Sequence, residues 1–271
     1  MTRQLPGTRY RNYTQFSGLT LLGRRLTLAA TPKPMKRNTK NAFTLIELLV
    51  VISIIAVLAS IALPVFTSVQ ERGFQTKDLS NAKQIGLACK LYAADHDGLF
   101  PDKDGTADPA VTPLAPGNTS NLAFANLVPL YLPTEKLFYL AKSRWSPNVP
   151  DENTAAAADR CEVSTNNYAY EMGLTEVSNP SFPLIADAPA TGGASAVYTS
   201  DQTAKGGVWK GKKAIVIRCD QSGTIETCTP GAGTTSTVVG PTGGAANANI
   251  FAPSATWLSA TGNSLLLPNT P

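Results

Sequence analysis

The longest apolar stretch of the chain runs from Phe43 to Phe66, with one charged residue, Glu47, near its start and one proline, Pro64, near its end. As a helix these 24 residues would extend ~36 Å, enough to cross a bilayer core of ~30 Å. We therefore predict a transmembrane helix over 43–66. A proline at position 64 kinks such a helix or simply marks the end of the membrane segment, and the two are compatible.

A helical pattern continues beyond the apolar stretch. Apolar and small residues recur there at spacings of three and four, on one stripe of a helix: Leu79, Ala82, Ile85, Gly86, Cys89, Tyr92 and Ala93. We predict one long helix over 43–94, with its second half, 67–94, outside the membrane and packed on a sheet. Leu87 and Leu91 lie off the stripe and face either a broad core or a neighbouring subunit. The turn residues at 95–98 end the helix.

Short segments rich in β-branched and aromatic residues follow, and they predict a small antiparallel sheet. The candidate strands are 167–172, 182–186, 196–199, 213–219 and 224–229. The turn Asp220-Gln221-Ser222-Gly223 joins the last two as a hairpin. The predicted fold class is α+β, with the long N-terminal helix packed on a small C-terminal antiparallel sheet.

Composition divides the part of the chain after the long helix into three regions. Residues 95–140 form a variable region of loop and short helix, and residues 141–229 form the β-sheet head. Residues 230–271 are rich in Gly, Thr and Pro, and we predict a flexible or extended tail there.

Charge separates a leader, residues 1–42, from the rest of the chain. Nine of the 23 Lys and Arg precede Phe43 without any Asp or Glu, and the remaining 14 face all 19 acidic residues, a balance of −5. The positive-inside rule keeps the leader in the cytoplasm and places the head outside, and the acidic balance argues against a nucleic-acid partner. Because Met35 begins a complete short basic leader, we expect residues 1–34 to be a mis-assigned extension; a genuine long leader is the alternative.

The segment Phe43-Thr44-Leu45-Ile46-Glu47, with the apolar stretch behind it, resembles the N-terminus of type IV pilins and of the pseudopilins of type II secretion. The resemblance covers residues 36–101. It implies a pilin-like fold, cleavage between Ala42 and Phe43 by a prepilin peptidase, and methylation of the new amine of Phe43. Ala42 departs from the Gly that the family has before the cleavage site, and its extra methyl group would slow or abolish cleavage.

The resemblance also implies that Glu47 pairs with the terminal amine of an adjacent subunit during assembly. A carboxylate alone in lipid costs a few kcal/mol, and a cationic amine in the same layer offsets that cost. A pair within one chain is the competing arrangement, because Phe43 and Glu47 lie one helical turn apart.

Four cysteines outside the cytoplasm could form disulfides, in three full pairings. We favour Cys219 with Cys228, and then Cys89 with Cys161; buried thiols are the alternative. Asp102 and Asp104 form a fragment of a calcium loop. The later Glu of such a loop is missing, so the choice is between a calcium site and a solvated acidic loop, and we expect no other cofactor.

Catalytic motifs are missing from the sequence. His96 is the single histidine, and no nucleophile elbow, zinc motif or phosphate-binding glycine loop occurs. We therefore do not expect an enzyme.

The resemblance implies a filament subunit, and we expect a type II secretion pseudopilin of the major, G-like kind. Residues 95–101 after the helix and a compact sheet ending in a hairpin are similar to that subgroup. Such a protein would be a single-pass inner-membrane protein with a cytoplasmic N-terminus and a periplasmic head. Its partners would be the prepilin peptidase, copies of itself, minor pseudopilins and the inner-membrane assembly platform. The alternatives are a type IV pilus pilin, for adhesion, motility or DNA uptake, and a membrane-anchored binding module that never polymerises.

Overall fold

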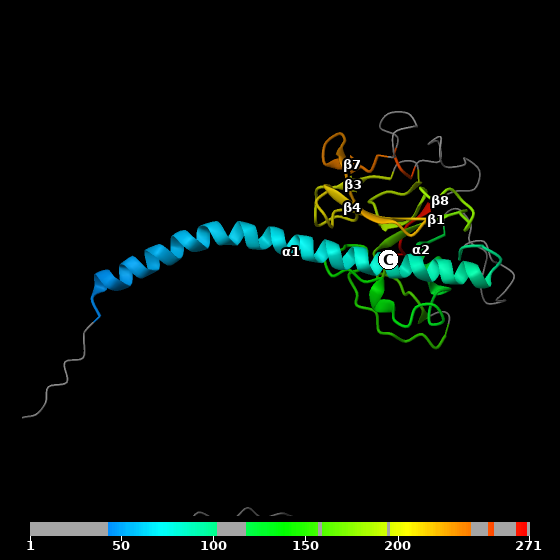
Figure 1. Ribbon diagram of the computed structural model, residues 1–271, viewed down its shortest axis with the longest axis horizontal. Helices are drawn as coiled ribbons and strands as arrows, with labels where there is room; N and C mark the ends of the chain where they lie inside the picture. The colour runs from blue at the N-terminus through cyan, green and yellow to red at the C-terminus, as the bar shows by residue number, and fades with distance from the viewer. Residues whose placement is uncertain are drawn as a thin grey trace, which may run out of the picture. The chain divides into compact units, whose positions relative to one another are not determined.

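The computed structural model describes residues 43–101, 118–156, 159–193, 196–239, 249–251 and 264–269. One long helix, α1 (Leu45–Asp95), precedes a head made of antiparallel strands and short helices (Figure 1). The predicted α+β arrangement is confirmed. The chain divides into two units between Ile55 and Ala56, and the start of α1 is described separately from the rest.

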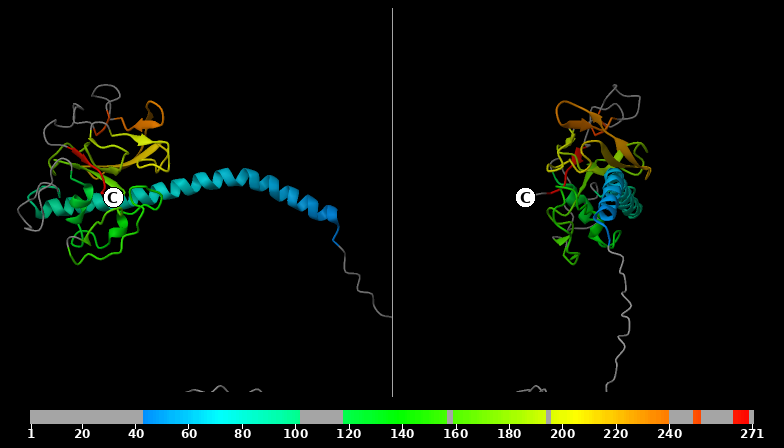
Figure 2. Two further views of the ribbon diagram at one scale, coloured as in Figure 1. Left: turned by 180° about the vertical axis from the view of Figure 1, so that it is seen from behind. Right: turned by 90° about the vertical axis from the view of Figure 1, so that its left-hand side faces the viewer.

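The main sheet of the head has five antiparallel strands in the order β5-β4-β2-β1-β8. Figure 2 shows the head and the C-terminal half of α1 from two further sides. Four of them match predicted strands: β1 (Tyr168–Met172), β2 (Pro183–Asp187), β4 (Lys213–Arg218) and β5 (Gly223–Thr227). The fifth strand, β8 (Ser264–Leu266), pairs with β1 at the edge of the sheet. A second sheet has the order β3-β7-β6, with β3 at Tyr198–Thr199, β6 at Thr229–Pro230 and β7 at Thr235–Thr237.

The C-terminal region departs from the prediction of a flexible or extended tail, because it supplies both β7 and β8. The chain around β8 is held by three backbone contacts with the short helix α2 (Ser120–Ala125) and the loop before β1. The amides of Ser120 and Ser164 donate to the carbonyls of Leu267 and Asn269, each at 2.9 Å, and the Asn269 amide donates to Asn121 Oδ1 at 2.8 Å. These bonds fix the edge of the main sheet.

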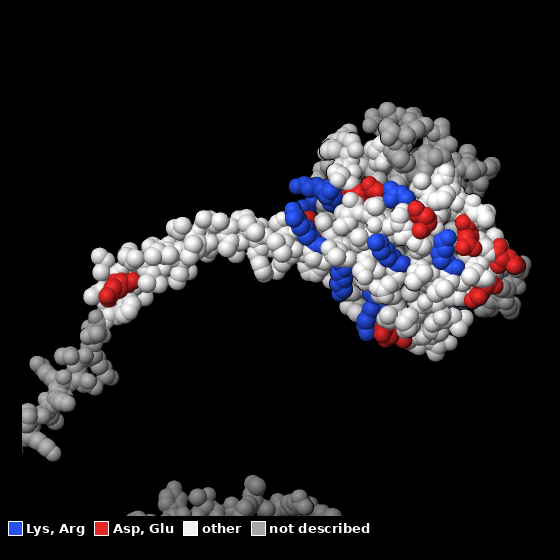
Figure 3. All heavy atoms as spheres, in the orientation of Figure 1, with Lys and Arg blue, Asp and Glu red and all other residues white. Residues whose placement is uncertain are grey.

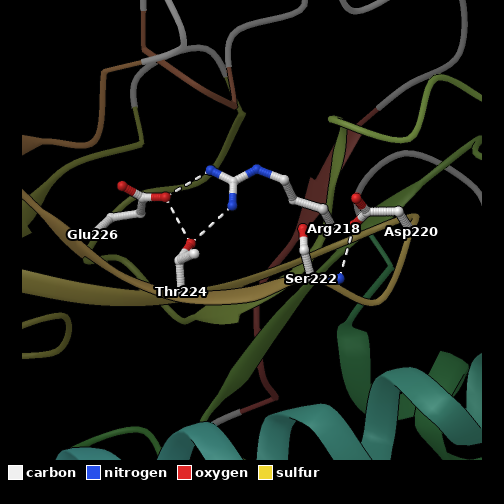
Figure 4. A network of polar contacts seen from close by, with 5 residues as sticks. All are labelled: Arg218, Asp220, Ser222, Thr224 and Glu226. Atoms are coloured by element: carbon white, nitrogen blue, oxygen red, sulfur yellow. Dashed lines mark hydrogen bonds and ion pairs between the residues drawn. The ribbon is translucent and has the colours of Figure 1, made fainter.

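The hairpin of β4 and β5 forms as predicted, around a turn at residues 219–222. The Ser222 amide donates to Asp220 Oδ1 at 2.7 Å within the turn. On the strands, Arg218 lies 2.6 Å from Glu226 Oε1 and donates to Thr224 Oγ1 at 2.8 Å (Figure 4). The pairing of Ile217 with Gly223 continues to Lys213 with Thr227, so the two strands are in register over their whole length.

One face of α1 packs beneath the main sheet and forms the larger hydrophobic core with β1, β4 and α2. The predicted stripe is buried from Ala82 to Ala93, whereas Leu79 is partly buried. Leu87 and Leu91 are 54% and 49% exposed, so they do not belong to that core. A Cβ on Gly86 would lie 2.9 Å from Ile217 Cγ2 and from Gln221 Oε1, so glycine allows α1 to approach β4 closely.

The sheet buries its other face in a second cluster, which alternates with the first along β4. In β4, Ile215 and Ile217 belong to the core shared with α1, whereas Ala214 and Val216 belong to the second cluster. Burial on both faces explains why β4 reads as a continuous apolar run from Ala214 to Ile217 rather than as an alternating one.

A buried polar contact joins α1 to this sheet. Asp78, which is 1% exposed, accepts a hydrogen bond from the Tyr168 hydroxyl through Oδ1, while its Oδ2 accepts none. The neighbouring Asp187 is satisfied by three donors: Asn167 Nδ2 at 2.8 Å, Trp209 Nε1 at 2.7 Å and the Ile215 amide at 3.0 Å.

The pKa values of the two buried carboxyl groups, Asp78 and Asp187, are both raised. Burial, together with the charge of Asp187, raises the pKa of Asp78 well above its usual value. Burial also raises the pKa of Asp187, although its hydrogen bonds counteract this. Because Asp187 already accepts three donated hydrogen bonds and Asp78 Oδ2 has no donor, we infer that Asp78 is the protonated partner. A neutral acid bonded to a carboxylate avoids placing two charges in the core.

This arrangement predicts a stability that falls as the pH rises. The folded state keeps a proton that an unfolded Asp releases above pH ~4. The contribution of Asp78 is therefore complete below pH ~4 and is lost as the pH rises through the raised pKa. The amide of Asp78→Asn still offers an acceptor to Tyr168 and a donor to Asp187, but it does not ionise as the pH rises. The test is denaturant unfolding of the full chain in micelles, followed by tryptophan fluorescence. Above pH ~4, the free energy of unfolding should fall with pH in the wild type but not in this variant.

The matched control is Asp187→Asn. It replaces an oxygen that accepts hydrogen bonds from Trp209 and Ile215 by an NH2 group that cannot accept them. We expect it to lose about 1–3 kcal/mol per unsatisfied group at every pH. If the pH profiles of the wild type and Asp78→Asn run parallel, Asp78 does not hold the proton.

Candidate functional site

The first turn of α1 carries the predicted assembly residue, Glu47, in a reciprocal contact with Thr44. The backbone amide and the hydroxyl of Thr44 both donate to Glu47 Oε2, each at 2.8 Å, and the Glu47 amide approaches Thr44 Oγ1 at 3.3 Å. Thr44 directly precedes the helix, so the pair forms a capping box. Two backbone donors that a helix start leaves unsatisfied therefore have partners.

This cap gives Glu47 a role that the sequence analysis missed. The signal was present, because a Thr followed three residues later by Glu, ahead of an apolar run, is the signature of a capping box. The cap uses only Oε2 of the carboxylate, and Oε1 has no hydrogen-bond donor within the described part of the chain. Since Glu47 is exposed, a second oxygen remains available to a cation from another molecule.

The rest of the apolar stretch is exposed on all sides, and every residue from Phe43 to Gln70 is open to the surroundings. Within the described residues, α1 is long and apolar enough to cross a bilayer. Three of its hydroxyl groups are satisfied within the helix, as a lipid environment requires. Ser53, Ser60 and Thr67 each donate to the carbonyl oxygen three residues earlier, at 2.7–2.9 Å.

Pro64 lies inside α1, which continues for more than thirty residues beyond it. The helix therefore runs through Pro64, while a kink there and the end of the membrane segment at this position stay predictions. Phe43 precedes the cap of α1 and is exposed. Ala42, on the other side of the predicted cleavage site, lies outside the described residues.

The predicted disulfides are wrong, because none of the four cysteines is in a disulfide and all four thiols are buried. Cys219 follows β4 and Cys228 follows β5, so the register of the hairpin places them at opposite ends of it. A six-residue strand extends ~20 Å, whereas a disulfide needs Cα atoms within ~7 Å. They also belong to different core clusters.

Cys89 and Cys161 share the larger core cluster but are not bridged. The backbone amide of Cys161 donates to Glu135 Oε1 at 2.6 Å. Burial raises the pKa of the Cys161 thiol, and it raises those of Cys219 and Cys228 to about 12. Thiols with such raised pKa values react slowly, so these residues act as small core residues.

The remaining candidate residues form no chemical site within the described part of the chain. Asp102 and Asp104, the predicted calcium ligands, lie outside the described residues. In the described part of the chain, no three His, Cys, Asp or Glu residues are placed to hold a metal ion. His96 stacks on Tyr92 with ring centroids 3.8 Å apart, and its Nδ1 lies 2.7 Å from the Tyr92 carbonyl oxygen, a contact that packs the end of α1.

Comparison with known proteins matches the N-terminal segment. Residues 37–63 match the family described as the prokaryotic N-terminal methylation motif. The chain is 41% identical over 61 residues to the type IV major pilin protein PilA of Myxococcus xanthus strain DK1622. That match covers 22% of this chain and 28% of the relative, well under two thirds of its length. No solved structure matches.

The N-terminal segment therefore carries a prokaryotic methylation motif and is similar to part of a type IV major pilin. Both similarities agree with the exposed apolar helix and the α+β head of this chain. The matched motif ends at residue 63, before the head begins, so the use of the head rests on physical argument.

The capping box predicts that Thr44→Ala frays the start of α1 and Thr44→Ser does not. Loss of an N-cap costs about 0.5–2 kcal/mol. Amide hydrogen exchange of the full chain in micelles should therefore accelerate at residues 45–48 in Thr44→Ala. Equal exchange in Thr44→Ala and the wild type would show that the cap does not hold the helix start.

Proposed function

We propose that this chain is a structural subunit of a pilin-like filament, assembled from the inner membrane after cleavage between Ala42 and Phe43 and N-methylation of Phe43. The observation that carries the proposal is the first turn of α1, where Glu47 is the single charged residue of a fully exposed apolar segment within the matched motif. An exposed apolar helix has to be covered by lipid or by other helices. Small residues on it, among them Ala56, Ala59, Ser60 and Ala62, permit close approach of such helices.

In this proposal Glu47 meets the terminal amine of Phe43 of an adjacent subunit through Oε1, which the cap leaves open. The partners are the prepilin peptidase, further copies of the chain, minor pseudopilins and the inner-membrane assembly platform. The leader stays in the cytoplasm and the head lies in the periplasm, as the basic residues before Phe43 favour. We also propose that Asp102 and Asp104 contribute ligands to a bound calcium ion.

The finer proposal is a pseudopilin of a type II secretion system. Residues 95–101, which follow α1, support it. The sheet supports it less, because a sheet that ends in the β4–β5 hairpin was expected and this one continues to β8. The second candidate is a type IV pilus pilin, favoured by the match to a type IV major pilin. Deletion of the gene distinguishes them: loss of exported proteins supports the pseudopilin, whereas loss of surface filaments with normal export supports the pilin.

A third candidate, a membrane-anchored module that does not polymerise, is favoured by Ala42, and processing tests it. We expect the intact mass of the protein from native membranes to begin at Phe43 with one added methyl group. Ala42→Gly should speed cleavage about 10- to 200-fold, the effect of one methyl group in a tight pocket, and Ala42→Val should slow it further. A mass that retains Ala42, with no cleavage in Ala42→Gly, would support the module instead.

The two roles of Glu47 can be separated with one substitution. Glu47→Gln keeps an oxygen acceptor for Thr44, since Gln also completes a capping box, but it removes the charge. We expect this variant to be processed and to keep the slow amide exchange of residues 45–48, yet to be at least about tenfold depleted from sheared filaments. Thr44→Ser serves as the control with both features retained. Wild-type levels of Glu47→Gln in filaments would contradict a charge-dependent assembly step.

A further inference from the structure

Exposed basic side chains gather where the apolar part of α1 gives way to the head. We call this group the basic collar and define it as Arg72, Lys77, Lys142, Lys210 and Lys212. Lys and Arg are concentrated on the side of the head next to the apolar part of the helix, and Asp and Glu lie mainly toward the other side (Figure 3). The chain as a whole is acidic after Phe43, so the collar is a local feature of the fold rather than of composition.

Contacts with α1 place the members of the collar that come from the head. Lys142 Nζ lies 4.1 Å from the centre of the Phe74 ring, and Lys210 Nζ lies 3.6 Å from Glu71 Oε2. Lys212 follows Lys210 by two residues and is exposed. With Glu71 included, the group carries five positive charges and one negative charge.

The far end of the same stretch of helix carries the opposite charge. Asp95 and Asp97 lie at the end of α1, and Glu176 is held beside them by its amide, which donates to the Gly98 carbonyl at 2.9 Å. Lys90 is the basic residue there, 3.7 Å from Glu176. A helix rises ~1.5 Å per residue, so the two ends lie ~36 Å apart along the axis between residues 71 and 95.

The position of the collar along α1 corresponds to the surface of a bilayer. The exposed apolar stretch ends at Val69, and residues 71–77 lie ~3–12 Å further along the helix. This is the depth of the headgroup region. Phe74, which is 39% exposed, is an aromatic residue at the level where such residues line membrane interfaces.

We propose that the basic collar binds the anionic headgroups of the bilayer that anchors α1, and so holds the head against the membrane until the subunit enters a filament. The proposal rests on the membrane anchor of the proposed function. Each Lys or Arg near an anionic surface strengthens binding about fivefold. The acidic end, at Asp95 and Asp97, is repelled by the same surface, so the charge asymmetry also orients the head.

The test uses the full chain in nanodiscs of phosphatidylcholine alone or mixed with phosphatidylglycerol. Lysines are acylated with a reagent that does not cross membranes, and labelling is mapped by mass spectrometry. We expect labelling of Lys142, Lys210 and Lys212 to fall about fivefold or more with phosphatidylglycerol, and to recover in 1 M NaCl, where the Debye length is about 3 Å. Lys136, which is outside the collar and pairs with Glu152, serves as the internal control.

A variant provides a second readout. Energy transfer from the native tryptophans to a dansyl-labelled headgroup should rise with phosphatidylglycerol in the wild type. It should not rise when Lys142, Lys210 and Lys212 are all changed to Gln. Lys136→Gln is the matched control and should behave as the wild type, since all four lysines are exposed and their loss leaves the core unchanged.

Three results would overturn the inference. Only the third of them would also contradict the proposed function. Equal labelling in both lipids would show that the collar does not bind anionic headgroups. Protection that depends on the number of copies per disc instead of on the lipid would assign the collar to a second copy, through the acidic end of that copy. Protein that alkaline carbonate releases from the discs would remove the membrane anchor, and with it the proposed function as well.

Discussion

One helix in this molecule has to be stable in two environments, and the other features follow from that constraint. The stretch of α1 up to Val69 is exposed all round and contributes no burial to the head, whereas the stretch from Asp78 is covered on one face by the sheet. The attachment of the head therefore depends on a short part of α1. Gly86 lets that part approach β4 closely, and the Tyr168 hydroxyl donates a hydrogen bond from the sheet to the buried Asp78.

Much of this fold could be predicted from the sequence, because the long helix and four strands of the main sheet have patterns that local residues determine. β7 and β8 could not, since their neighbours in sequence are rich in Gly, Thr and Ala, and Ser264–Leu266 is a strand only because the edge of β1 is there to pair with it. The cysteines show the same limit. Cys219 and Cys228 are near in sequence, but the register of the hairpin separates them.

The candidate site was partly predictable for the same reason. Glu47 is conspicuous as an isolated acid in an apolar stretch, and its cap with Thr44 was also readable locally. Asp78 was not, because an acid on the buried stripe resembles an interruption of the pattern until its partners are known. Tyr168 and Asp187 lie about a hundred residues away in sequence. The basic collar likewise combines three segments that only the fold brings together.

The position of β8 bears on the order of events during synthesis. Every other strand of the main sheet precedes it in the chain, so the sheet can be assembled as far as β1 while β1 still has an open edge. An open edge pairs readily with other chains. The edge of β1 thus stays open to aggregation until residues 264–269 bond to Ser120, Asn121 and Ser164. Docking of β8 is then the step that closes this edge of the main sheet.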